Sequence, residues 1–393
     1  MFRLDRGSLQ ERLQGAGVSW LILLITLSLS FGLDVKLIGL QSYTLIEHMK
    51  RVEEFPPLLE GRRVREWIRE DKLPEGRLFI DNREMGEKDL EKLREVMNLE
   101  AVEELVVVRY GWTLKRTSMR MYPTDRVIHK GNPKIDYNQY TLLEPFTPLA
   151  ILHTSRDGNW LYLQAPYMRG WVRKEDVHQR DRESLLKLKE MPFLVVTQGK
   201  VNIGKTTFGL GSRVPYLAKE GKRYKVLLPD GTSLWIEKFE GLEEGYPAFS
   251  EERVRNILEG LLGTPYDWGG KEGKWDCSSL VQSLYAVFGA ELPRNSAQQA
   301  RIGRVVATGF SSYQEFKNLL KTLPPFRTLL FMKGHVMLYG GMEGEDIVIY
   351  HSVYSMKRED GNRWLMEAVR KNYVESEGLR NLFRSLVSVN VLD

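Results

Sequence analysis

Residues 276–288 read DCSSLVQSLYAVF and contain Cys277, the only cysteine of the 393-residue chain. Apolar side chains recur there at the spacing of one helix face, and Gly289 follows, so the segment predicts a helix. Aspartate is a favoured N-cap residue, so Asp276 places Cys277 in the first helical turn. Backbone N–H groups at a helix start favour a thiolate, the nucleophilic form of cysteine. The segment therefore predicts a nucleophile, although a lone cysteine also fits the role of a small buried hydrophobe.

A cysteine nucleophile needs a base, and two of the six histidines lie in the same region of the chain. His335 opens one predicted strand and His351 directly follows the next. The glycine-rich residues 340–345 between them predict a hairpin that sets the two imidazoles side by side. One imidazole can then activate the Cys277 thiol while the second orients the first through a ring-nitrogen hydrogen bond. Taken alone, each histidine also fits a structural strand-end residue.

The region around these three residues predicts an α+β fold. Residues 254–262 and 277–288 have helical spacing, and apolar strand candidates follow at residues 328–331, 335–339 and 346–350. A helix followed by antiparallel strands is typical of the α+β class.

Two earlier stretches, residues 105–178 and 193–238, contain short β-rich runs separated by polar turns. Asp157-Gly158 between two such runs is a hairpin signal. We therefore expect two successive small barrels, with the charged residues 180–189 as their connector. The preceding segment, residues 33–104, has helical spacing and no chemical motif, so packing against the other domains is its expected role.

The N-terminus indicates export. Residues 18–33 form an uncharged apolar run behind three arginines, about right for a signal-peptide core and short for a span of about 20 residues. A signal peptide is the favoured interpretation, and an uncleaved anchor or a buried helix are the alternatives. One cysteine excludes an intramolecular disulfide and a cysteine zinc cluster. The net charge of +5 fits an anionic partner such as a cell-wall polymer, and is too diffuse to indicate nucleic acid.

Five short motifs resemble those of the NlpC-type cell-wall peptidases, papain-like enzymes of bacterial envelopes. They occur in the expected order, as residues 266–270 (YDWGG), 276–279 (DCSS), 292–296 (LPRNS), 334–339 (GHVMLY) and 351–352 (HS). Residues 115–124 and 157–172 resemble the first SH3-like module of one subgroup, which also carries a bracing segment and a second such module. The domain organisation that this implies is 1–32 signal peptide or membrane anchor, 33–104 helical bracing segment, 105–180 first SH3-like barrel, 190–245 second SH3-like barrel, and 246–393 papain-like peptidase domain.

The resemblance implies cleavage of the γ-D-glutamyl–L-diamino acid bond of murein stem peptides, in wall turnover or recycling in the periplasm or cell envelope. Carried over residue by residue, it makes Cys277 the nucleophile, His335 the general base and acid, and His351 the orienting residue. Tyr266 matches a tyrosine whose hydroxyl lies near the oxyanion site. The only membrane contact expected is through an uncleaved N-terminal segment.

In the SH3-bearing subgroup the first module closes one end of the cleft, which leaves room for a short stem with a free L-alanine terminus. The resemblance implies that Asp276 counters this ammonium group and that the Ser278 hydroxyl bonds the stem nearby. Arg294 and Ser296 match the motif that contacts the acidic substrate, and Tyr167 is the candidate module side chain that reaches the cleft.

Three positions depart from the family pattern. Ser279 stands where glycine is usual, Asn295 where aspartate is more frequent, and Thr147 where glutamate often precedes a proline. Serine is only slightly larger than glycine, so we expect activity to survive at Ser279. The departure at Thr147 leaves the selectivity for a free N-terminus open.

Two other functional interpretations stay open, namely a non-catalytic wall-binding protein and a papain-like amidase or acyltransferase. A metalloenzyme is disfavoured because the two histidines and one distant cysteine lack tight ligand spacing, and no cofactor is predicted. Residues 199–206, GKVNIGKT, match a phosphate loop by letter, but the glycines and proline that follow make the required helix unexpected.

Overall fold

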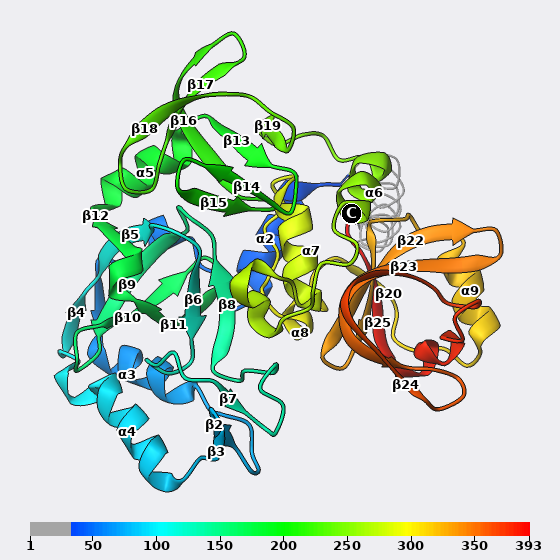
Figure 1. The fold of residues 1–393 in the computed structure, drawn as a ribbon, viewed down its shortest axis with the longest axis horizontal. Helices are drawn as coiled ribbons and strands as arrows, with labels where there is room; N and C mark the ends of the chain where they lie inside the picture. The colour runs from blue at the N-terminus through cyan, green and yellow to red at the C-terminus, as the bar shows by residue number, and fades with distance from the viewer. Residues whose placement is uncertain (1–32) are drawn as a thin grey trace, which may run out of the picture.

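The computed structural model describes residues 33–393 as three β-sheet regions joined by short helices (Figure 1). The fold class is α+β, as predicted. The predicted signal peptide or anchor, residues 1–32, lies outside the described residues. Within residues 33–393, no helix combines the length and the apolar character that crossing a bilayer requires.

The N-terminal segment is mainly helical. Its residues 52–102 share a core with the first large sheet, whereas Ile38 and Ile46 pack in the core of the C-terminal region. The helix predicted over residues 88–97 is α4 (Glu87–Met97), which ends where Asn98 takes a left-handed φ of 57°. Helix α3 (Gly61–Glu70) buries Trp67. The other elements of the segment are α2 (Val35–Leu45), η1 (Val52–Glu54), β1 (Leu58–Glu60), β2 (Phe79–Ile80), β3 (Arg83–Glu84) and η2 (Leu99–Ala101).

A seven-stranded antiparallel sheet follows, in the order β12-β5-β9-β10-β11-β6-β8. The predicted turn at Asp157-Gly158 joins β9 to β10, and Gly158 has the positive φ of 71° that such a turn requires. The strands are β5 (Arg109–Thr113), β6 (Thr117–Arg120), β8 (Gln139–Leu143), β9 (Pro148–Thr154), β10 (Trp160–Ala165), β11 (Met168–Arg173) and β12 (Val177–Arg180). Two short strands, β4 (Leu105–Val107) and β7 (Ile128–His129), pair instead with β1 and β2 of the N-terminal segment.

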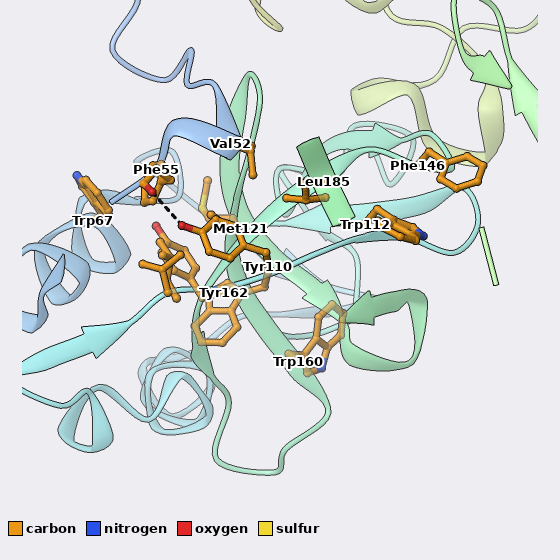
Figure 2. Close-up of a cluster of buried hydrophobic side chains, with 14 of the residues drawn as sticks. Val52, Phe55, Trp67, Tyr110, Trp112, Met121, Phe146, Trp160, Tyr162 and Leu185 are labelled. Carbon is orange, nitrogen blue, oxygen red and sulfur yellow. Dashed lines mark hydrogen bonds between the residues drawn. The ribbon is translucent and has the colours of Figure 1, made fainter. Parts of the chain in front are cut away.

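An apolar cluster joins the N-terminal segment to this sheet. In Figure 2, Phe55 of the N-terminal segment lies beside Tyr110 of the sheet, whereas Trp112 and Phe146 lie away from the N-terminal segment. The Tyr110 hydroxyl donates a hydrogen bond of 2.9 Å to the Phe55 carbonyl, so the buried phenol is satisfied. The N-terminal segment therefore braces the sheet through a shared core.

The second predicted barrel region contains a five-stranded sheet and a separate hairpin. Residues 180–189, expected as a connector, largely form helix α5 (Arg182–Glu190), which follows the short helix η3 (Lys174–Asp176) and strand β12. The phosphate-loop pattern falls in the hairpin of β14 (Lys200–Ile203) and β15 (Thr206–Gly209), where no helix follows the loop. The five strands are β13 (Phe193–Val196), β16 (Arg213–Glu220), β17 (Arg223–Leu227), β18 (Ser233–Glu237) and β19 (Leu242–Glu244).

The C-terminal region packs helix α7 (Cys277–Ala286) against a six-stranded sheet in the order β20-β25-β21-β22-β23-β24. In Figure 1, α7 lies centrally between this sheet and the seven-stranded one. The strands are β20 (Arg304–Ala307), β21 (Thr328–Met332), β22 (His335–Glu343), β23 (Asp346–Lys357), β24 (Arg363–Tyr373) and β25 (Leu386–Val391). The helices are α6 (Glu251–Glu259), η4 (Trp268–Gly273), α7, α8 (Ser296–Gln299), α9 (Tyr313–Leu320) and η5 (Arg380–Ser385).

The hairpin that carries both histidines is longer than predicted. Strand β22 continues to Glu343, past a bulge after Tyr339, and β23 continues well past Tyr350. His351 therefore lies within β23, opposite Arg370 of β24, and does not close a strand. The predicted strands ended where their apolar runs end. Strand β23 continues further because its pairing with β24 also holds polar residues in the sheet.

Candidate active site

Cys277 is the first residue of helix α7, as the sequence predicts. Asp276 is the N-cap, and its carboxylate accepts a hydrogen bond of 2.8 Å from the Ser279 backbone N–H. A hydrogen bond from the Val336 backbone N–H, at the start of β22, acts on the pKa of the thiol, so the sulfur lies close to this strand. Cys277 is 8% exposed and lines a cavity of about 570 Å³. The helix start, the strand start and the cavity thus meet at the sulfur.

The charge state of the thiol differs from the thiolate that the sequence favours. Burial raises the pKa of Cys277 to about 12, and the neighbouring Asp276 carboxylate adds to the increase. The backbone N–H groups of Val336 and Ser278 and the Arg294 guanidinium lower the pKa by less. The helix N-terminus is therefore outweighed by loss of water, and a base must take the proton during the reaction.

His335 and His351 lie side by side, as the hairpin predicted. Nε2 of His335 is 2.9 Å from Nδ1 of His351, and Nε2 of His351 is 2.8 Å from Oδ1 of Asn372. Burial lowers the pKa of His335 to about 3, with a contribution from His351, and lowers that of His351 to about 4. Both imidazoles are therefore neutral at pH 7, so His335 can accept a proton.

Asp276 and Arg294 form a buried ion pair at the base of the nucleophile helix. Their closest contact joins Nη2 of Arg294 to Oδ2 of Asp276 at 2.6 Å. The carboxylate also accepts hydrogen bonds from the backbone N–H groups of Gly269 and Ser279 and from the Ser278 hydroxyl. Burial would raise the pKa of Asp276, but Arg294 and the hydrogen bonds from Ser279 together hold it below its usual range.

This pair also links the start of the nucleophile helix to the seven-stranded sheet. Nε of Arg294 donates a 2.7 Å hydrogen bond to the Thr141 hydroxyl on β8 of the seven-stranded sheet. The same strand contacts Gly269, whose φ is 69° and where an added Cβ would lie 2.4 Å from Cγ of Gln139. A side chain at Gly269 would therefore push β8 away from Asp276 and the nucleophile helix.

Of the other predicted site residues, Tyr266, Ser278 and Ser296 line the same cavity as Cys277. Burial raises the pKa of Tyr266 well above its usual value, and the negative charges of Asp276 and Cys277 add to the increase. Tyr266 is thus close enough to the sulfur for their charges to interact.

The structure does not bring Tyr167 to this cavity. Tyr167 and Thr147 line a second cavity of about 240 Å³, beside the far end of helix α7. Its phenol still interacts electrostatically with Arg294, which lowers the otherwise raised pKa of Tyr167. The Thr147 hydroxyl donates to the Glu144 carbonyl at 2.6 Å. Both residues therefore lie behind the cleft wall in this structure.

The cleft wall comes from segments that carry no chemical motif. The N-terminal segment and the seven-stranded sheet together contribute about half of the lining, namely His48, Trp67, Glu70, Asp71, Lys72, Pro74, Met121, Tyr137, Gln139, Tyr140, Met168 and Arg169. Burial raises the pKa of Asp71 to about 7, while a hydrogen bond from the Tyr140 hydroxyl opposes the rise. Sequence reasoning missed both residues, because their approach to Cys277 depends on packing between domains.

Comparison with known proteins agrees with this geometry. The sequence profile of the SH3 domain (SH3b1 type) matches residues 128–173, and that of the NlpC/P60 family matches residues 263–383. The second match contains the Cys277 helix and both histidine strands. The chain therefore carries an NlpC/P60 domain.

Two curated relatives of this chain are both named gamma-D-glutamyl-L-lysine dipeptidyl-peptidase. The one from Bacillus cereus (strain ATCC 10987 / NRS 248) is 33% identical over 100 residues, which cover 24% of this chain and 30% of the relative. The one from Bacillus subtilis (strain 168) is 24% identical over 225 residues, covering 51% of this chain and 72% of the relative. The first match thus spans less than a third of that relative's length.

A solved NlpC/P60 endopeptidase from Photobacterium damselae subsp. piscicida has a similar structure. The two chains share 20% identity with a TM-score of 0.66, over 84% of this chain and 83% of the other. At this identity the likeness establishes a shared fold, which extends beyond the NlpC/P60 domain to the sheets before it.

Proposed function

We propose that this protein is a cysteine peptidase of the bacterial cell envelope that hydrolyses the γ-D-glutamyl–L-diamino acid bond of murein stem peptides. One observation carries the proposal. Cys277 lies at a helix start in a cavity, against the first residues of β22, where His335 is hydrogen-bonded to His351. The names of the two relatives support this bond as the substrate.

The proposed reaction begins with transfer of the thiol proton from Cys277 to His335. The sulfur attacks the γ-carbonyl carbon of D-glutamate, and the Cys277 N–H and the Tyr266 hydroxyl stabilise the negative oxygen that results. The protonated His335 then donates its proton to the amine of the diamino acid as the C–N bond breaks. Water, deprotonated by His335, attacks the thioester and releases the acyl product and the free thiol.

We further propose that the substrate is a short stem with a free L-alanine terminus. The N-terminal segment and the SH3b1-type domain both line the cavity, and this supports the proposal that the cleft is closed at one end. The Asp276 carboxylate already accepts five hydrogen bonds, two of them from Arg294. Glu70 of the wall, together with Asp71 in its ionised form, therefore supplies the additional negative charge that the ammonium group would face.

The test is incubation of the reduced protein with L-Ala-γ-D-Glu-diaminopimelate and identification of the products by mass spectrometry. We expect L-Ala-D-Glu and free diaminopimelate, and Cys277→Ala should abolish turnover without changing the melting temperature. Activity retained by Cys277→Ala would refute the assigned nucleophile. A transferred acyl group, or release of ammonia, would identify an acyltransferase or an amidase instead.

The same assay with an N-acetylated peptide tests the free terminus. We expect acetylation to lower kcat/KM at least tenfold, because it removes the positive charge and adds bulk at the closed end. Equal kcat/KM for the two peptides would refute the short-stem proposal and leave the peptidase proposal intact.

A further inference from the structure

The hydrogen bonds that begin at His335 continue past His351 to two residues outside the sequence motifs. Nε2 of His351 is 2.8 Å from Oδ1 of Asn372 on β24, and Nδ2 of Asn372 is 2.6 Å from Oε2 of Glu377. His351 and Asn372 are each 1% exposed. The four side chains therefore form one series of polar contacts, whose two central members, His351 and Asn372, are buried.

Glu377 determines which way the Asn372 amide points. A carboxylate only accepts hydrogen bonds, so it must face the NH₂ group of Asn372. The Tyr373 backbone N–H also donates to Oε2 of Glu377, at 3.2 Å, which fixes the carboxylate itself. The amide oxygen of Asn372 is thereby directed at His351.

The amide orientation in turn fixes the protonated nitrogen of each imidazole. Because Oδ1 of Asn372 can only accept, Nε2 of neutral His351 must carry the hydrogen, and its Nδ1 is a lone pair. That lone pair faces Nε2 of His335 at 2.9 Å, so Nε2 of His335 must also carry a hydrogen. The remaining lone pair of His335 is then on Nδ1. With the other tautomer, two lone pairs would face each other in a buried site.

We propose that Asn372 and Glu377 are positioning residues that hold His335 as its Nε2–H tautomer, so that its Nδ1 takes the proton of the Cys277 thiol. In that step the S–H bond breaks, the proton joins Nδ1 of His335, and the sulfur keeps the electron pair. The catalytic consequence rests on the proposed peptidase function, whereas the tautomer does not.

The tautomer is measured directly by two-dimensional NMR of protein labelled with ¹⁵N-histidine, and His335→Gln and His351→Gln variants assign the signals. In the wild-type protein at pH 7 we expect pyrrole-type Nε2 and pyridine-type Nδ1 for both residues. A pyrrole-type Nδ1 on either histidine would overturn the proposal. This measurement needs no substrate, so its outcome is independent of whether the proposed activity is found.

Variants of the two positioning residues provide the second test. Asn372→Leu keeps the branching at Cγ and lacks the acceptor, so His351 should exchange between tautomers and kcat should fall about 10- to 100-fold with KM little changed. Glu377→Ala frees the amide to rotate and should give a smaller fall in kcat, with the same mixing of tautomers. Glu377→Gln, whose side-chain oxygen can still accept from Asn372, should restore most of the lost kcat and the single tautomer.

Glu375→Ala is the matched control, because Glu375 lies in the same turn but bonds the Ile347 N–H and Lys317. It should change neither the tautomers nor kcat. If Glu375→Ala and Glu377→Ala have equal effects, the turn matters only for folding and the proposal fails. The proposal also fails if Glu377→Ala leaves the tautomers and kcat unchanged. This result can be measured even if Asn372→Leu does not fold.

Discussion

Replacing Arg294 with leucine should destabilise the protein through the carboxylate that it leaves behind. In the wild-type protein the Asp276 carboxylate accepts five hydrogen bonds, two of which come from Arg294. Breaking a buried pair by removing one partner costs about 3–5 kcal/mol, since an uncompensated charge stays buried. The three remaining donors solvate this charge in part, so we expect a loss near the lower end, about 3 kcal/mol.

The pH dependence of this loss follows from the sign of the pKa change. In the wild-type protein the pKa of Asp276 lies below the unfolded value of 3.8, so the carboxylate contributes stability above that pH and loses it as the pH falls. In Arg294→Leu, burial is no longer opposed by the guanidinium, and the pKa of Asp276 should rise above the unfolded value. The variant therefore regains stability relative to the wild type as the pH falls and the carboxyl is protonated.

The assay is urea unfolding followed by tryptophan fluorescence at several values between pH 7 and pH 4. The double variant Asp276→Asn/Arg294→Leu should recover most of the loss, because asparagine keeps the N-cap oxygen without the charge. Arg62→Leu is the control, since Arg62 is 77% exposed and pairs with Glu66 at 3.9 Å. It should cost less than about 1 kcal/mol. A loss in Arg294→Leu below 1 kcal/mol, or one independent of pH, would refute the buried-charge argument.

Three other predictions follow from the site. Gly269→Ala should destabilise the protein by about 2 kcal/mol more than Gly263→Ala in melting experiments, because both glycines have positive φ but only Gly269 meets a neighbouring side chain. Alkylation of Cys277 by iodoacetamide should keep accelerating up to pH 9 without a plateau, because its pKa is raised to about 12; a plateau near pH 7 would contradict this. Stability should fall as the pH decreases from 6.5 towards 4, since the depressed pKa values of His335 and His351 make the unfolded chain bind more protons; pH-independent urea midpoints in this range would refute it.

The sequence predicted well those features that depend on neighbours along the chain. The N-cap at Asp276, the start of the helix at Cys277 and the pairing of His335 with His351 each follow from a local pattern of residue types. Asn372 could not be found this way. Its contact with His351 depends on the register between β23 and β24, and Asn372 follows the charged residues Arg370 and Lys371, beyond the apolar part of β24.

The protonation state of the nucleophile was beyond sequence reasoning for a different physical reason. A helix N-terminus favours the thiolate, and this local effect is visible in the sequence. Burial acts in the opposite direction, and its size depends on how closely the first sheet and the N-terminal segment cover the cleft. The Cys277 thiol is 8% exposed, which is enough for desolvation to dominate.

The same packing links the wall of the cleft to the nucleophile helix. Arg294 bonds Asp276 at the start of the nucleophile helix and Thr141 on the wall, so one side chain fixes the distance between them. A shift of β8 would expose Cys277 to water, and restored solvation would lower the pKa of the thiol. Thr141→Val, which removes the hydroxyl that accepts from Arg294, should therefore speed alkylation of Cys277 at pH 8 without removing the ion pair. If the alkylation rate is unchanged while the cavity still admits the reagent, the wall does not control the pKa of the Cys277 thiol.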